Sequence, residues 1–553
     1  MPPKLSSEVP LLDETPTDKL VVGPGPDEDE VTRIISEEAY CFTVDDIPGV
    51  CRYDGTRVAS NDPTQDRFIH GRFPPPWKSK SEWITWGIFD GHGGWETADV
   101  LEKQLLRFVR SNLVEYEGQD SVPDMLVRAA IMRGFMELDD CLVKSAKTTV
   151  TSNMPSQDKV KRLALGFVGS CALLSIYDPG TRNLHVACTG NSRAVLVSEE
   201  ENPGEWSVEH LSEDQTGYNQ SEVLRLGQEH PYEPNMIRNG RLYGLEVTRA
   251  FGDGTYKWSL PLASYIGNNF GMRGGTANSL RTPPYVGAGP KVTSTNIDPT
   301  RISFMIMASD GFWERITTRQ AAKLVVSWLK FRTRTKESAV KYEPELKPTG
   351  MNLFNESSSY IEEGPPDEYK TMKTFHPREI SSPGDIDVPP TFGTDGASDD
   401  NEDRDNADPD EMNPDNVDPN EMNPDNADPD EMNPDNVDSD DTNVDDMDLN
   451  AIEYSGRSAW GFTSEEADSE VSMVMPDYPP FNFSLIRAGM PLSFVEARTT
   501  VEDDNAAVHL IRNVLGGKYR GMIASQLAFN NGNARHIRDD ITVQVVFFNT
   551  PFI

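Results

Sequence analysis

The chain has 553 residues, a formal net charge of −39 and 37% apolar residues. This charge argues against nucleic acid as a partner, because phosphate backbones are bound by an excess of Lys and Arg. No stretch approaches the roughly 18 consecutive apolar residues of a membrane-spanning helix, so we expect no membrane insertion. The five cysteines are odd in number and form no CxxC pair, which favours a reducing intracellular compartment.

The first 34 residues predict a disordered tail, because they combine several prolines with the acidic run Asp27 to Glu30. The first 30 residues contain Lys4 and Lys19 against eight acids, and no Arg. Mitochondrial transit peptides are basic and poor in acids, so no transit peptide is visible here.

Two globular blocks follow, at residues 35–333 and 466–553. Apolar runs typical of strands recur in both, at residues 83–89, 171–177, 184–188, 194–197, 304–308 and 541–548. Apolar residues at helical spacing follow the first strand, at Ala98, Leu101, Leu105 and Phe108. Because strands come in adjacent pairs, the pattern predicts an α+β fold with layered sheets. We expect the last strand to complete the sheets of the first block.

Residues 334–465 predict a low-complexity, disordered acidic insertion between the two blocks. Residues 395–448 contain 23 Asp plus Glu against one Arg, a net charge of −22, and carry repeats such as DNADPDEMNP. A calcium loop of the EF-hand type would need a mid-loop Gly and a closing Glu, which are absent. The segment is therefore interpreted as a solvated spacer, which also suits docking of a basic partner protein.

Several carboxylates stand at strand ends. Asp90 directly follows a predicted strand, Asp310 is the second residue after another, Asp539 and Asp540 directly precede the last one, and Asp66 lies upstream in NDPTQDRF. Asp-Gly is also a turn signal, which is the alternative for each single case. Clustered carboxylates repel one another unless cations lie among them, and oxygen ligands suit Mg²⁺ or Mn²⁺ rather than Zn²⁺.

Six motifs follow one another along the two blocks: FDGHGG (89–94), GSCA (169–172), TGNSRAVL (189–196), VTRAFGD (247–253), ASDGFWE (308–314) and RDDITV (538–543). Together they resemble the metal-dependent Ser/Thr protein phosphatases of type 2C. The resemblance implies a four-layer α/β-β/α sandwich of two mostly antiparallel sheets flanked by helices. It also implies hydrolysis of phosphoserine and phosphothreonine in proteins.

Further stretches are similar to the pyruvate dehydrogenase phosphatases and their fungal relatives. They are SNDPTQDR (60–67), LSEDQTGYNQSEVLRLGQEHP (211–231), FGDGTYKW (251–258), TPPYV (282–286) and NAAVHLIRNVLGG (505–517). This similarity implies the pyruvate dehydrogenase complex as the phosphoprotein substrate and the mitochondrion as the location. Since no transit peptide is visible, the cytoplasm is the alternative.

By this resemblance Asp90 would bridge two Mg²⁺ or Mn²⁺ ions, the backbone carbonyl of Gly91 would coordinate one of them, and Asp310 and Asp539 would hold the other. A hydroxide bridging the ions would attack phosphorus in line. His92 would act as the general acid that protonates the leaving Ser or Thr oxygen.

Two departures from the family pattern remove negative charge from this cluster. Gln65 stands where the family usually has a Glu ligand, and Asn191 stands where it has an Asp linked to a third metal. Both are expected to be weaker metal ligands, which makes a third ion doubtful, whereas Asp66 keeps its carboxylate. Asp253 and Arg193 match supporting positions near the site.

Two functions therefore stay open from the sequence. The first is an active metal-dependent phosphatase. The second is a weakened or non-catalytic binding protein of the same fold, which uses the acidic insertion for docking; Gln65 and Asn191 motivate it.

Overall fold

The computed structural model describes residues 25–75, 77, 81–119, 121–274, 279–336, 457–458, 496–529 and 534–550. The chain divides into two units, Met1–Thr374 with Ser455–Ile553, and Phe375–Tyr454. All described residues belong to the first unit. The predicted acidic repeat and most of the predicted tail and insertion lie outside the described residues.

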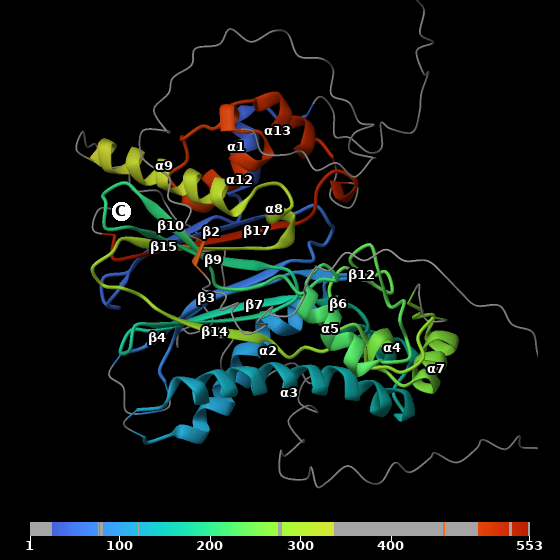
Figure 1. Cartoon of the computed structure of the whole chain (residues 1–553). Helices are drawn as coiled ribbons and strands as arrows, with labels where there is room; N and C mark the ends of the chain where they lie inside the picture. Colours follow the sequence, from blue (N-terminus) through green and yellow to red (C-terminus); the bar gives the residue numbers. More distant parts are fainter. Residues whose placement is uncertain are drawn as a thin grey trace, which may run out of the picture. The chain divides into compact units, whose positions relative to one another are not determined.

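Two antiparallel sheets form the centre of this unit (Figure 1). The larger sheet has the spatial order β1 (Tyr40–Thr43), β2 (Val50–Val58), β17 (Ile541–Phe548), β15 (Ser303–Ala308), β9 (Arg193–Glu199), β10 (Trp206–His210) and β16 (Arg457–Ser458). The other sheet has the order β14 (Lys291–Asn296), β8 (Asn183–Thr189), β7 (Ala172–Asp178), β4 (Trp83–Phe89) and β3 (Arg67–Phe73). Strand β17 lies between β2 and β15, so the end of the chain completes a sheet of the first block, as predicted.

Helices cover the outer face of each sheet. The larger sheet is covered by α1 (Glu28–Ser36), α9 (Thr318–Lys336), α12 (Ala506–Leu515) and α13 (Arg520–Leu527), and the other sheet by α2 (Glu96–Leu113) and α3 (Asp124–Thr151) (Figure 1). The remaining helices are α4 (Ser156–Phe167), α5 (Gln220–Glu229), α6 (Gly254–Lys257), α7 (Leu260–Phe270) and α8 (Asp310–Trp313). These layers confirm the predicted α+β, four-layer sandwich.

Three apolar cores hold the layers together, one between the sheets and one under each helical layer. Strand β15 contributes to two of them: Phe304 and Ile306 face the helices, while Met305 and Met307 face the other sheet. Burial on both faces explains why this strand is a continuous apolar run. Both methionines are therefore core residues.

Helix α1 corrects the predicted tail of residues 1–34, because its residues 28–34 are helical. Asp27 caps the helix by accepting a hydrogen bond from the Glu30 backbone N–H, at 2.9 Å. Val31 and Ile35 are buried in the core beneath the larger sheet's helices. The acidic residues that suggested a tail therefore include the favourable first turn of an amphipathic helix.

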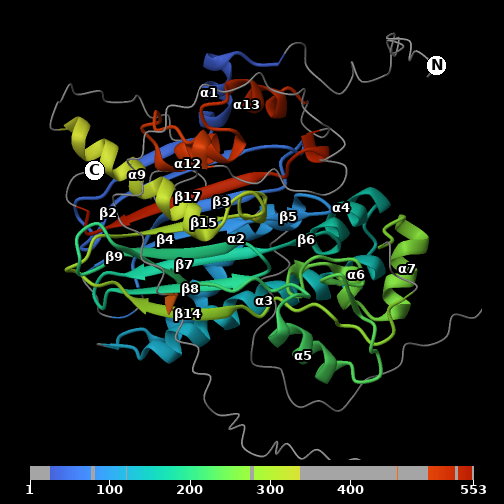
Figure 2. The ribbon, with the colours of Figure 1, turned by 45° about the horizontal axis from the view of Figure 1, so that its top comes forward.

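Two small sheets lie beside the main ones. One has the order β13 (Phe251–Gly252), β6 (Gly169–Ser170) and β5 (Gly91–His92), and the other is the hairpin of β11 (Ile237–Arg238) and β12 (Arg241–Leu242). Figure 2 shows β5 and β6 at the end of the main sheets where α6 and α7 also lie.

All five cysteines are free thiols. Within the described part of the chain, every helix is too short or too polar to cross a membrane.

Candidate active site

The strand-end carboxylates of the larger sheet lie side by side. Strand β15 pairs antiparallel with β17, and Ala308 stands opposite Val543. The residues after β15 therefore lie beside those before β17, which places Asp310 next to Asp539. Gly311 makes this approach possible, because a Cβ there would lie 2.9 Å from the Cβ of Asp539 and would collide with the Asp540 carbonyl oxygen.

Asp90 joins this group from the other sheet. It follows β4, and its Oδ2 accepts a long hydrogen bond of 3.4 Å from the backbone N–H of Asp310. The backbone of Asp90 is fixed by the Cys171 N–H, which donates to its carbonyl oxygen at 2.8 Å. The cluster therefore spans the ends of both sheets.

The carboxylates of this cluster disfavour one another's charge. Burial, followed by the charges of Asp310 and Asp66, raises the pKa of Asp90 well above its ordinary value. Burial and the neighbouring Asp540 and Asp310 raise the pKa of Asp66 to about 7, although Thr542 donates to its Oδ2 at 2.6 Å. A cation among these groups would remove the repulsion.

Asp310 carries an oxygen suited to a ligand role. Its Oδ2 accepts a hydrogen bond of 2.9 Å from the Asn191 side chain, whereas its buried Oδ1 has no hydrogen-bond partner among the described residues. Buried carboxylate oxygens are rarely left without a partner. Together with the neighbouring carboxylates, this oxygen fits a hard cation such as Mg²⁺ or Mn²⁺.

The two amide residues lie in different surroundings. Asn191 is buried between Asp310 and the Cys171 thiol, which donates to its Oδ1 at 3.3 Å. The Gln65 backbone lies close to Gly91, because a Cβ at Gly91 would lie 2.6 Å from the Gln65 carbonyl oxygen.

Asp539 forms an ion pair with Arg535, four residues earlier. A cation bound by Asp539 would compete with Arg535.

His92 is paired with Asp253 by the small sheet. In that sheet β6 lies between β5 and β13, so that His92 and Gly252 both stand opposite Gly169. His92 Nε2 lies 2.8 Å from Asp253 Oδ2. A side chain at position 169 would collide with His92 Nε2, so glycine is required there.

The Asp253 carboxylate controls the charge of His92. Burial alone would lower the pKa of His92, but the charge and hydrogen bond of Asp253 outweigh burial and raise it. The imidazolium is thus stabilised next to the carboxylate cluster.

Arg193 has a different environment, because its guanidinium pairs with Asp214 at 3.0 Å and lies over the Trp313 ring.

Two further carboxylates, Glu246 and Glu314, lie beside Asp310 and were not predicted from the sequence. Oxygens of Glu246, Asp310 and Glu314 all lie within 4.8 Å of one another. Burial and the charges of Asp310 and Glu246 raise the pKa of Glu314 to about 7. The available signals were weak: Glu314 follows Asp310 by four residues, one helical turn, and Glu246 directly precedes the motif VTRAFGD.

Asp540 anchors the loop that carries Gln65 and Asp66. Its carboxylate accepts hydrogen bonds from the backbone N–H groups of Ser60 (2.5 Å), Asn61 (3.0 Å) and Gln65 (2.7 Å), and from the Asn61 side chain. Burial opposes its charge, but these hydrogen bonds outweigh burial and lower the pKa of Asp540.

We expect Asp540→Ala to destabilise the fold by about 3–5 kcal/mol, because three backbone donors lose their buried acceptor. Urea unfolding followed by circular dichroism measures this loss. Asp298→Ala is the matched control, since Asp298 also accepts from a backbone N–H, that of Thr300, but lies on the surface. Equal destabilisation by the two changes would contradict the anchoring role.

Comparisons with known proteins show which family this chain resembles. A family model described as protein phosphatase 2C matches residues 49–343. A protein phosphatase 2C homolog of Schizosaccharomyces pombe is 38% identical over 312 residues, which cover 55% of this chain and 69% of that protein.

Two further relatives are mitochondrial phosphatases of pyruvate dehydrogenase. The Saccharomyces cerevisiae pyruvate dehydrogenase phosphatase 1 is 36% identical over 329 residues, 56% of each chain. The human pyruvate dehydrogenase phosphatase 2 is 27% identical over 341 residues, 51% of this chain and 62% of that one. The alignments thus span less than two thirds of these two relatives. Since the family model covers more than half of this chain, the chain belongs to the protein phosphatase 2C family.

Proposed function

We propose that the protein hydrolyses phosphoserine and phosphothreonine in other proteins with the help of Mg²⁺ or Mn²⁺. The observation that carries this proposal is the meeting of Asp90, Asp310 and Asp539 at the ends of two sheets, next to the paired His92 and Asp253. Membership of the protein phosphatase 2C family supports it.

In this proposal Asp90, the Gly91 carbonyl oxygen, Asp310 and Asp539 would hold two ions, and Asp90 would contribute to binding both of them. Asp66 adds a further buried carboxylate to the same group. Mg²⁺ or Mn²⁺ bound there would lower the pKa of a coordinated water and so supply hydroxide near neutral pH.

Gln65 and Asn191 would be weaker ligands, because an amide oxygen brings no charge. The Asn191 amide group already donates to Asp310, so its oxygen is directed towards Cys171 instead. We therefore propose two ions and at most a weakly bound third.

His92 supplies the proton that the leaving Ser or Thr oxygen needs. Its Nε2 is engaged by Asp253, which leaves Nδ1 as the ring nitrogen that can reach a substrate. Asp253 fixes the orientation of the ring and favours its protonated form.

The substrate that we propose is the phosphorylated pyruvate dehydrogenase complex, acted on in mitochondria; the names of two relatives support both points. A phosphoproteome comparison with and without the gene, beginning with the α-subunit of pyruvate dehydrogenase, tests the substrate. Imaging of a C-terminal fluorescent fusion tests the location, with the cytoplasm as the alternative.

Two experiments test the dependence on metal ions: removal of the metal, and replacement of the two amides by carboxylates. We expect EDTA to abolish phosphate release from a phosphoserine peptide, and Mn²⁺ to restore it. Gln65→Glu combined with Asn191→Asp should lower the Mn²⁺ concentration needed for half-maximal activity roughly 10-fold, because carboxylates bind hard cations better than amides. Absence of activity in millimolar Mn²⁺, in both the natural and the restored protein, would instead favour the non-catalytic binding protein.

A further inference from the structure

A polar cavity of about 580 Å³ lies against the β11–β12 hairpin, and one of its lining residues, Arg241, pairs with Glu246 of the carboxylate cluster. Three arginines line it, Arg238, Arg241 and Arg281, together with Tyr232 and Tyr243. The protein as a whole carries a net charge of −39, so a cavity with three guanidinium groups is a local exception.

The positive charges of this cavity are only partly balanced by its own walls. Its acidic residue Glu233 is buried and accepts hydrogen bonds from the hydroxyls of Tyr243 (2.7 Å), Tyr285 (2.8 Å) and Thr282 (2.5 Å). The side chains of Arg238 and Arg281 are exposed and form no ion pair with any described residue. Two guanidinium groups are therefore available to an anionic ligand.

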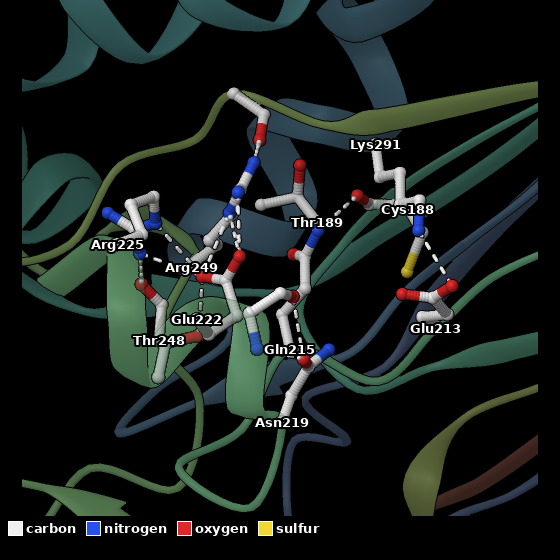
Figure 3. Close-up of polar contacts among 12 residues, drawn as sticks. Cys188, Thr189, Glu213, Gln215, Asn219, Glu222, Arg225, Thr248, Arg249 and Lys291 are labelled. Atoms are coloured by element: carbon white, nitrogen blue, oxygen red, sulfur yellow. Dashed lines mark hydrogen bonds and ion pairs between the residues drawn. The ribbon is translucent and has the colours of Figure 1, made fainter. Parts of the chain in front are cut away.

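The segment that contains the β11–β12 hairpin is tied together at its two ends. Glu222, at the start of α5, accepts hydrogen bonds from Arg249 (2.6 Å) and Arg225 (2.7 Å), as Figure 3 shows. Arg249 also donates to the Gly289 carbonyl oxygen at 2.7 Å. This ion-pair group ties together the two ends of the segment between residues 222 and 249, which contains the hairpin.

The cavity is connected to the carboxylate cluster by one ion pair. Arg241 lies 2.5 Å from Glu246, and Glu246 belongs to the group with Asp310 and Glu314. An extended peptide advances roughly 3.3–3.6 Å per residue, so a phosphoserine at the cluster would bring residues a few positions away into the cavity.

We propose that this cavity binds carboxylate side chains of the substrate protein, a few residues from the phosphorylated serine or threonine, through Arg238 and Arg281. The proposal rests on the phosphatase function proposed above and adds the specificity of that site. An acidic substrate is repelled by the net charge of the protein, and a positively charged cavity beside the site offsets that repulsion where the peptide binds.

Two series of phosphoserine peptides test the proposal, identical except that Glu or Gln stands at one position from two to six residues on either side of the phosphoserine. We expect the natural protein to prefer Glu at one or two of these positions by roughly 10-fold in kcat/KM. Arg238→Ala combined with Arg281→Ala should bring this ratio close to one. Because the ratio is taken within each protein, a general loss of activity does not affect it.

Arg107→Ala is the matched control, since Arg107 is an exposed arginine on α2, outside the cavity lining. It should keep the ratio of the natural protein. A ratio of one in the natural protein, or a ratio unchanged by the double substitution, would overturn the proposal while leaving the phosphatase function intact; failure to hydrolyse any peptide would overturn both. If deletion of residues 395–448 and the double substitution both increase activity on the Glu peptides, the cavity binds the chain's own acidic segment and the proposal is wrong.

Discussion

We expect Asp90→Asn to reduce kcat/KM for a phosphoserine peptide by at least about 10²–10³-fold, the size of effect seen when one preorganised electrostatic group is removed from an active site. The change replaces a shared carboxylate by an amide of the same shape, so it removes charge without creating a cavity. Steady-state kinetics at saturating Mn²⁺ measure the loss.

We expect Asp90→Asn not to lower the stability of the metal-free protein, although it lowers the activity. Burial and the charges of Asp310 and Asp66 disfavour the Asp90 carboxylate, so its neutral replacement relieves repulsion. Thermal unfolding in EDTA should therefore give a melting temperature equal to or above that of the natural protein.

Asp178→Asn is the matched control for this experiment. Asp178 is also buried, but it lies at the other end of the strands, where it accepts hydrogen bonds from Gly180 and Thr181. It should leave kcat/KM within a few-fold. If Asp90→Asn has an equally small effect, or if Asp310→Ala leaves activity unchanged, the proposed metal chemistry is wrong.

The sequence predicts best those elements whose burial is visible in a single run of residues. Strands β4, β15 and β17 are buried along their whole length, and each reads as an uninterrupted or nearly uninterrupted apolar segment. Asp90 and Asp310 could be predicted as site candidates for the same reason, since each is the first or second residue after such a strand.

Strand β2 escaped prediction because it contains a buried ion pair. Arg52 and Asp54 lie 2.8 Å apart within the strand, and Asp54 also accepts from the Ala506 backbone N–H. The Ala506 N–H, which further stabilises this buried carboxylate, is 452 residues away in the sequence. From the local sequence alone, the pair Asp54-Gly55 indicates a turn rather than a strand.

Contacts within the site between residues far apart in the sequence could not be predicted for the same reason. His92 and Asp253 are separated by 161 residues and meet only because the three short strands of the small sheet align them. Glu246 and Asp310 likewise lie far apart in the sequence and meet only in the folded chain. Such contacts depend on tertiary structure, which residue spacing alone does not specify.

The pairing of His92 with Asp253 leads to a prediction that separates proton donation from other roles. We expect His92→Ala to reduce kcat for a phosphoserine peptide by about 10²–10⁴-fold, because the serine alkoxide is too basic to leave unprotonated. With p-nitrophenyl phosphate, whose leaving group is a weak base, the same substitution should cost far less. Parallel measurements of kcat on the two substrates give the ratio that reports proton donation.

Asp253→Asn should show the same dependence on the leaving group with a smaller loss, since it leaves the imidazole in place but removes the charge that favours its protonated form. His210→Ala serves as the control, because His210 is an exposed histidine on β10 and should show no such dependence. An equal loss on both substrates for His92→Ala would mean that His92 supports the structure of the site or binds phosphate, and that the proton comes from another group. Since the His92 ring is one quarter exposed, at 27%, solvent water next to it is the first candidate for that group.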